Sequence, residues 1–302
     1  MGVPVTRPAA RLNRPVPAIL LRLTSAGLFA VMAALIQVAS GLGVPLLHIM
    51  FWRFGFGLLP LVAYIAIRSD FSAIRTSRPR AHLIRSAVGL FSMWASFEAV
   101  RRLPLAEATT ISFAAPLLAV ALSTLFLGEK VGWRRWSAVA VGLIGVGVVM
   151  QPGGTPLDRT GLLFAAGGAL GVATVTLAIR RLGATEKPET IVWWFTVGSM
   201  VALSPLLLTV PWPSGRAAWG LLLAIGLTGG IAQIAMTSSL RLAPVPVVAP
   251  FDYSQIVWAT ALGWLMVGHL PARATWAGGG LIVLSGLYSL FRERQLARAR
   301  VR

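Results

Sequence analysis

The most informative side chain in this sequence is a carboxylate inside an apolar run. Asp252 follows Pro250, and the polar and aromatic side chains near it in sequence include Tyr253, Gln255 and Trp258. A charge deep in an apolar helix is costly unless it faces a cavity or a partner. We therefore expect these four side chains to line a site where the carboxylate binds a cationic or zwitterionic group or carries a proton. The alternative is a structural ion pair between Asp252 and a buried arginine.

Arg53 is the obvious candidate for such a partner. It lies in the run WRFGFG, inside another apolar stretch. Its planar donor fork suits a carboxylate, which belongs either to the protein or to a bound molecule. A third alternative is that the side chain extends along the helix to the membrane interface.

Four further residues are candidates for the same site. Gln233 carries a primary amide at mid-depth, which needs a partner from another helix, a water molecule or a ligand. Ser112 lies 140 residues before Asp252 in a matching sequence context. Trp94 lies deeper and is a candidate for the cavity, and Glu98, one helical turn further on, is a candidate for an outer mouth. For Glu98, ion pairing with the nearby Arg101 and Arg102 is the alternative.

Several kinds of chemistry are excluded by composition. The sequence has no cysteine, and its three histidines, His48, His82 and His269, fit no zinc-binding spacing. It also has no glycine-rich nucleotide-binding motif ending in Gly-Lys-Ser or Gly-Lys-Thr. We expect no cofactor, no metal site and no catalytic residues.

The overall composition indicates a membrane protein. The chain has 302 residues, of which 56% are hydrophobic and 12% charged, with a mean hydropathy of +0.77. The net charge of +18 is spread over short clusters between apolar runs. Because no single solvated face collects these charges, we expect a lipid bilayer as the surrounding medium and no nucleic-acid partner.

The apolar runs predict an all-α integral membrane protein with ten transmembrane helices, each about 20 residues long. The predicted spans are residues 19–38, 45–67, 83–100, 105–127, 134–150, 160–179, 190–210, 217–237, 245–267 and 274–291.

The basic residues predict how these spans are oriented. Most of the 27 Lys and Arg residues, including Arg22 and Arg85, fall on one side if the spans alternate in direction. The exceptions on the other side are Arg101, Arg102, Arg159, Arg216 and Arg273. Loops rich in Lys and Arg stay in the cytoplasm, so we expect both termini there, in a bacterial inner membrane.

An internal repeat divides the ten spans into five and five. Residues of the same or similar type recur 140 positions apart at Ser112 and Asp252, Phe113 and Tyr253, Gly128 and Gly268, and Trp136 and Trp276. Because five is odd, the second half enters the membrane from the opposite side and the two halves form inverted repeats. The predicted domains are a cytoplasmic segment 1–18, repeats 19–150 and 151–291, and a basic cytoplasmic tail 292–302.

Prolines and glycines within the spans predict local features. Pro116 and Pro250 are expected to bend the fourth and ninth spans, which either shapes a central cavity or is structural only. Gly167 with Gly171, and Gly226 with Gly230, have the spacing that lets helices approach closely.

The run from Leu103 to Met150 and its counterpart from Arg241 to Tyr288 resemble the EamA-type repeats of the drug/metabolite transporter superfamily. The most specific shared features are Pro116, Gly128, Glu129, Gly142 and Gly145. His269 departs from the pattern, because the second half usually has Glu at that position. The resemblance covers nearly the whole chain and implies a ten-helix carrier of small metabolites.

The expected function is secondary transport of a small organic metabolite by alternating access. The candidate substrates are cationic, zwitterionic or flat aromatic, such as an amino acid, a nucleoside-like compound or a vitamin. A coupling proton and a monomeric or homodimeric state are part of the same expectation. The alternatives are an intramembrane enzyme acting on a lipid-linked substrate and a membrane receptor or scaffold that transports nothing.

We predict that Asp252→Asn changes transport or ligand binding more than Glu129→Gln does, because only Asp252 lies inside a span. The measurement is a substrate assay on variants shown to insert normally. If both variants match the wild type, the site lies elsewhere.

Overall fold

The computed structural model describes residues 14–68, 75–127, 132–150, 157–183, 185–243, 245–267 and 271–299, and every regular element in these ranges is a helix. Gly128, Glu129, Gly268 and His269 lie outside the described residues, so this part of the repeat stays a prediction.

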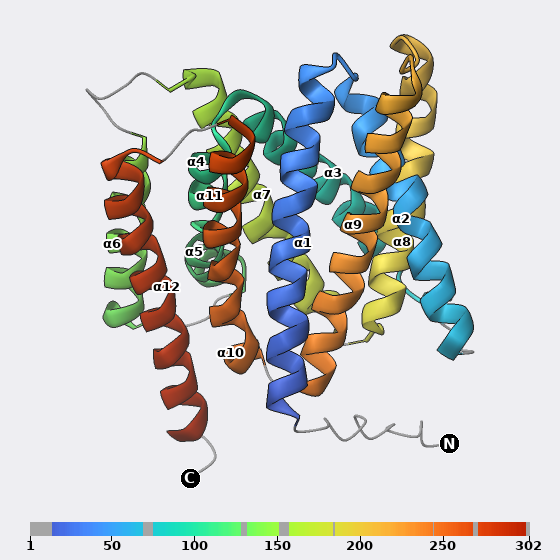
Figure 1. The fold of residues 1–302 in the computed structure, drawn as a ribbon. Coiled ribbons are helices and arrows are strands. Elements are labelled where there is room, and N and C mark those ends of the chain that lie inside the picture. The colour runs from blue at the N-terminus through green and yellow to red at the C-terminus, as the bar shows by residue number, and fades with distance from the viewer. Residues whose placement is uncertain are drawn as a thin grey trace, which may run out of the picture.

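The long helices lie side by side in one bundle, with α6 and α12 at one edge and α2 and α8 at the other (Figure 1). The start of α1 and the end of α12 lie at the same end of this bundle (Figure 1). The elements are α1 (Pro15–Gly41), α2 (Leu46–Arg68), α3 (Pro79–Arg102), α4 (Leu105–Ser112), α5 (Ala115–Leu127), α6 (Trp133–Val149), α7 (Arg159–Leu182), α8 (Pro188–Leu203), the 3-10 helix η2 (Ser204–Thr209), α9 (Arg216–Leu242), α10 (Val245–Val248), the 3-10 helix η3 (Ala249–Tyr253), α11 (Ser254–Val267) and α12 (Arg273–Ala299).

Seven helical stretches in the described part of the chain are long and apolar enough to cross a membrane. They are Pro15–Gly41, Leu46–Ile67, Pro79–Arg102, Leu105–Phe126, Arg159–Ile179, Glu189–Thr209 and Arg216–Ser239, and Trp136–Val149 is a shorter apolar helix. The prediction of an all-α protein that crosses the membrane several times is confirmed.

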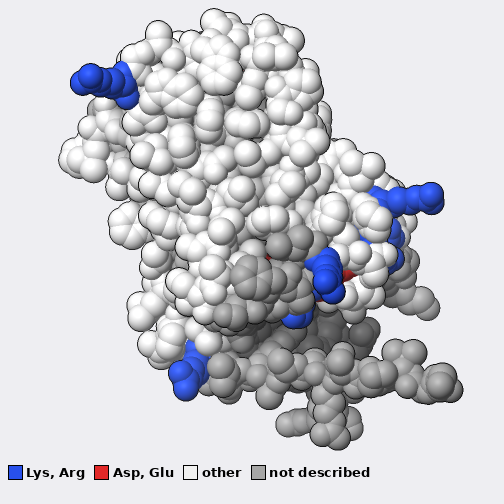
Figure 2. Space-filling model, turned by 90° about the vertical axis from the view of Figure 1, so that its right-hand side faces the viewer, with Lys and Arg blue, Asp and Glu red and all other residues white. Residues whose placement is uncertain are grey.

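The surface agrees with a lipid environment. Figure 2 shows a face on which a wide area carries no charged side chain, with Lys and Arg at its top edge, lower part and right margin. Many large apolar side chains are exposed on the bundle, among them Ile67, Leu83, Leu163 and Trp133, which are between 71% and 84% exposed. Such a continuous apolar surface is stable against acyl chains and unfavourable in water.

Both predicted proline bends are complete breaks in the helix. The fourth span divides into α4 and α5, with Pro116 at the second position of α5. The ninth span divides into α10, η3 and α11, with Pro250 at the second position of η3. Proline lacks the backbone donor that a continuous helix requires and is well suited to the first turn of a new helix.

Two helices begin earlier than predicted, so two arginines lie further from the helix start than predicted. α1 starts at Pro15 and α3 at Pro79, each with proline in the first turn. Arg22 and Arg85 therefore lie about two turns inside their helices and are buried. The membrane side to which the sequence assigned them stays a prediction, and the structure adds that both side chains lie within the bundle.

Small residues bring the main helix pairs together. α9 crosses α2 where a side chain on Gly230 would meet the carbonyl oxygen of Gly57 at 2.8 Å. α7 approaches α3 where a side chain on Gly171 would meet Cβ of Ser92 at 2.7 Å. Gly167, predicted to share this role, faces open space, and Gly168 packs against Ser96 instead, because that residue lies on the face turned to α3.

α6 and α12 form a third close pair through Gly145 and Gly278. We predict that Gly278→Ala lowers the free energy of unfolding by about 1 to 3 kcal/mol, because the methyl group would lie 2.7 Å from the Val149 side chain. The matched control on the same helix is Gly280→Ala, which meets nothing within 4 Å and gains helix propensity. Thermal unfolding in detergent measures both, and equal unfolding temperatures would contradict this packing.

Candidate functional site

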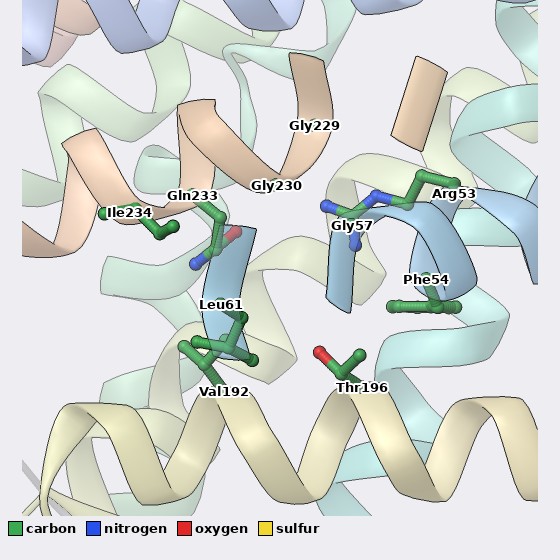
Figure 3. Close-up of a pocket in the computed structure, with 10 residues that line it drawn as sticks. All are labelled: Arg53, Phe54, Gly57, Leu61, Val192, Thr196, Gly229, Gly230, Gln233 and Ile234. Atoms are coloured by element: carbon green, nitrogen blue, oxygen red, sulfur yellow. The ribbon is translucent and has the colours of Figure 1, made fainter. Parts of the chain in front are cut away.

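A cavity lies between α2, α8 and α9, toward the edge of the bundle that α2 and α8 form. It is narrow, with a volume of about 20 Å³, and its lining residues are Arg53, Phe54, Gly57, Leu61, Val192, Thr196, Gly229, Gly230, Gln233 and Ile234. The guanidinium of Arg53, the hydroxyl of Thr196 and the amide of Gln233 reach this space from three different helices (Figure 3). The structure thus brings together two of the predicted site residues, Arg53 and Gln233.

Glycines on α9 make room for the charged group. Gly226 and Gly230 contact Gly57 and Pro60, which holds α9 close to α2. The intervening Gly229 faces Arg53, and a side chain there would lie 3.4 Å from its Nε and 2.8 Å from Sδ of Met32. A larger residue at position 229 would therefore displace the guanidinium or the methionine.

Arg53 is held by an aromatic ring rather than by a carboxylate. Its guanidinium carbon lies 4.9 Å from the centre of the Phe54 ring, and its Nε is buried with no hydrogen-bond partner. An aromatic face stabilises a cation but takes up none of its N–H donors. Nε is therefore enclosed and unsatisfied, while the end of the guanidinium faces the cavity (Figure 3).

Arg85 forms a second unpaired cation next to the first. Its guanidinium carbon lies 3.7 Å from the centre of the Phe195 ring, and Nε and Nη1 are buried without a hydrogen-bond partner. Phe195 meets Phe54 edge to face, with ring centres 5.1 Å apart. Each ring of this contacting pair therefore faces one guanidinium group.

Asp252 is paired with Arg22, not with Arg53. Both carboxylate oxygens accept hydrogen bonds from the guanidinium of Arg22, which joins η3 to α1. The arginine side chain is 10% exposed and the aspartate side chain 35% exposed. The ion pair that was the alternative for Asp252 is therefore present, with a partner that the sequence did not identify.

The neighbours of Asp252 have different surroundings. Tyr253 is buried and packs against Phe113, with ring centres 5.0 Å apart, so it belongs to an apolar core. Trp258 lies 3.6 Å from the position of a side chain on Gly27 and is 48% exposed. Gln255 is partly buried on α11. None of these residues lines the cavity at Arg53.

The remaining candidates also lie away from this cavity. Ser112 donates its hydroxyl to the carbonyl of Thr109 in its own helix. Trp94 packs edge-on against Phe164, with ring centres 5.0 Å apart. Glu98 accepts hydrogen bonds from Arg101 and Arg102 at 3.0 Å each, which is the local ion pairing that was the alternative for this residue.

Sequence reasoning missed Arg22, Arg85, Thr196 and Gly229. The signal that would have located both arginines is proline, because Pro15 and Pro79 each open a helix two turns earlier in the chain. Thr196 carried no such signal, since threonines in apolar helices commonly bond their own backbone.

The chain matches the sequence profile of the EamA-like transporter family over residues 16–151 and again over 159–291. The chain belongs to this family. The expectation that it is not an enzyme is thereby supported, because the family consists of transporters.

Curated relatives of this EamA-like transporter align over most of their length. A riboflavin transporter of Vibrio cholerae is 28% identical, covering 90% of this chain and 92% of the relative. A pseudopaline exporter of Pseudomonas aeruginosa is 29% identical, covering 88% and 93%. An S-adenosylmethionine uptake transporter of Rickettsia felis is 23% identical, covering 82% and 84%.

A solved crystal structure has the same fold. It superposes with a TM-score of 0.62 at 23% identity and covers 92% of this chain and 98% of its own.

We predict that Arg22→Met and Asp252→Asn each lower the free energy of unfolding by about 2 kcal/mol, because each leaves a partly buried charge without its partner. The double variant should lose less than the sum of the two, since neither charge then remains unpaired. Thermal unfolding of the four proteins in detergent gives the coupling. Strict additivity would show that the pair contributes nothing.

Proposed function

We propose that this EamA-like protein is a secondary transporter that moves a small organic metabolite across a membrane, with the substrate bound in the cavity of Arg53, Thr196 and Gln233. The observation that carries the proposal is this group of hydrogen-bonding side chains between three apolar helices. Polar groups at such depth are costly in a merely structural role, and in transporters they mark substrate pathways.

The proposed mechanism is alternating access between two inverted five-helix halves, residues 19–150 and 151–291. Three observations support it. The family profile matches twice, over residues 16–151 and 159–291. Both halves have a broken span, α4–α5 and α10–η3–α11. The pairs α1 with α9 and α3 with α7 are equivalent if the first helix of each half packs on the third helix of the other.

The cavity has a position suited to this mechanism. Arg53 belongs to the first proposed half, whereas Thr196 and Gln233 belong to the second. A rocking motion of one half against the other changes which end of the cavity is open, while the binding groups stay in place. Counting each broken span as one crossing gives the proposed ten, with both termini cytoplasmic in a bacterial inner membrane.

The relatives suggest the kind of cargo without choosing one. Their names give riboflavin, pseudopaline and S-adenosylmethionine, and they include both uptake and export. We therefore propose a small organic substrate for this chain as well, and we propose no direction of transport. Proton coupling through Asp252, and contacts of Tyr253, Gln255, Trp258, Ser112, Trp94 and Glu98 with substrate, stay predictions.

We predict that purified protein in proteoliposomes transports at least one of riboflavin, S-adenosylmethionine and succinate faster than empty liposomes do. Thr196→Val and Gln233→Leu should each lower that rate about tenfold, because a hydrogen bond to the substrate is lost. The matched control is Thr176→Val, whose hydroxyl is on another helix and bonds the carbonyl of Val172. Flux that is equally affected by all three variants would contradict this site.

A further inference from the structure

We propose that the substrate carries a carboxylate, which Arg53 receives directly while Arg85 supplies a second positive charge behind it. The inference rests on the proposed function, because it names the chemical class of substrate for the same cavity.

The first argument is an imbalance of charge. Arg22, Arg101 and Arg102 each pair with a carboxylate in the described part of the chain. Neither Arg53 nor Arg85 takes part in these pairs, although Arg85 is only 7% exposed. Two largely buried guanidinium groups without a carboxylate partner are costly, and a bound anion would balance their charge.

The second argument is the way the two cations are held. Phe54 and Phe195 meet edge to face, and each presents its ring to one guanidinium, Arg53 and Arg85 respectively. These contacts place each guanidinium next to a ring and use none of its N–H donors. A guanidinium held in this way can form two parallel hydrogen bonds to a carboxylate.

The rest of the cavity suits an organic acid better than an inorganic anion. Thr196 and Gln233 add a hydroxyl and an amide to the polar side, and Leu61, Val192 and Ile234 supply an apolar wall. A small molecule with one carboxylate and an apolar body matches both parts.

This assignment changes the sign of the expected substrate charge. The preference for a cationic or zwitterionic substrate rested on Asp252, and the structure pairs Asp252 with Arg22. The charged residue that lines the cavity is instead Arg53, with Arg85 next to it through the Phe54–Phe195 contact, so the complementary head group is an anion. A zwitterion remains compatible through its carboxylate, whereas a simple cation does not.

The test uses four ligands that share one ring and differ in head group: benzoate, benzamide, benzylamine and phenyl phosphate. Each is titrated against the purified full chain at constant ionic strength, and the unfolding temperature is recorded. We expect benzoate to raise it in a concentration-dependent manner and benzamide and benzylamine to leave it unchanged. Equal stabilisation by benzamide or benzylamine, or no shift with benzoate, overturns the inference. A larger shift with phenyl phosphate overturns the choice of carboxylate.

Variants separate a binding role from a structural one. Arg53→Lys keeps the charge but loses the fork, and should weaken benzoate about 10- to 100-fold. Arg85→Gln should also weaken benzoate, yet without ligand it should unfold no lower than wild type, because a buried charge without a carboxylate partner is removed. The matched control is Arg216→Gln, an exposed arginine whose loss should leave benzoate binding unchanged. If Arg85→Gln and Arg53→Lys bind benzoate normally and only lose stability, both arginines are structural and the inference fails.

The proteoliposome assay distinguishes this inference from the proposed function. Transport of riboflavin or S-adenosylmethionine at wild-type rates in both Arg53→Lys and Arg85→Gln keeps the transporter and overturns the carboxylate site. Benzoate binding that depends on Arg53, together with no flux of any tested compound, supports the site and rejects transport.

Discussion

The cost of placing a charge inside an apolar bundle is the constraint on which this structure depends. Water is absent around buried side chains, so each buried charge needs an ion partner, an aromatic face or a ligand. Asp252 and Arg22 meet this requirement within the chain, through an ion pair between η3 and α1. Arg53 and Arg85 meet it only in part, because their aromatic partners leave the N–H donors unsatisfied.

This difference divides the buried charges by role. A satisfied pair such as Arg22 and Asp252 ties two elements together and fixes their relative position. An unsatisfied pair of cations stores an electrostatic imbalance that a bound anion relieves, which is what a binding site requires. The cavity beside Arg53 is therefore a better candidate for the substrate than the surroundings of Asp252, although Asp252 is the more conspicuous residue in the sequence.

Close helix packing is what allows the site to exist. Gly57, Gly226 and Gly230 bring α2 and α9 together, and Gly229 leaves the space that the Arg53 side chain fills. In the other helix pairs, Gly145 with Gly278 and Gly171 with Ser92 have the same packing role. Small residues at these crossings let the helix backbones approach closely, and this close packing holds the helices together in lipid. The cavity then lies between α2, α8 and α9.

The sequence by itself determined the class of the protein and most of its helical spans, because hydropathy and length are local properties that one chain segment carries alone. It also located both helix breaks through Pro116 and Pro250, and it identified Arg53 and Gln233 as unusual polar residues. Only the tertiary structure decided which charges meet. Arg22 and Asp252 are 230 positions apart, and no local pattern relates them. The assignment of Arg53 to a cavity, of Arg85 to its neighbourhood and of Tyr253 to the core likewise depended on which helix faces pack together. The partners of a side chain lie on other helices, and no pattern within its own helix identifies them.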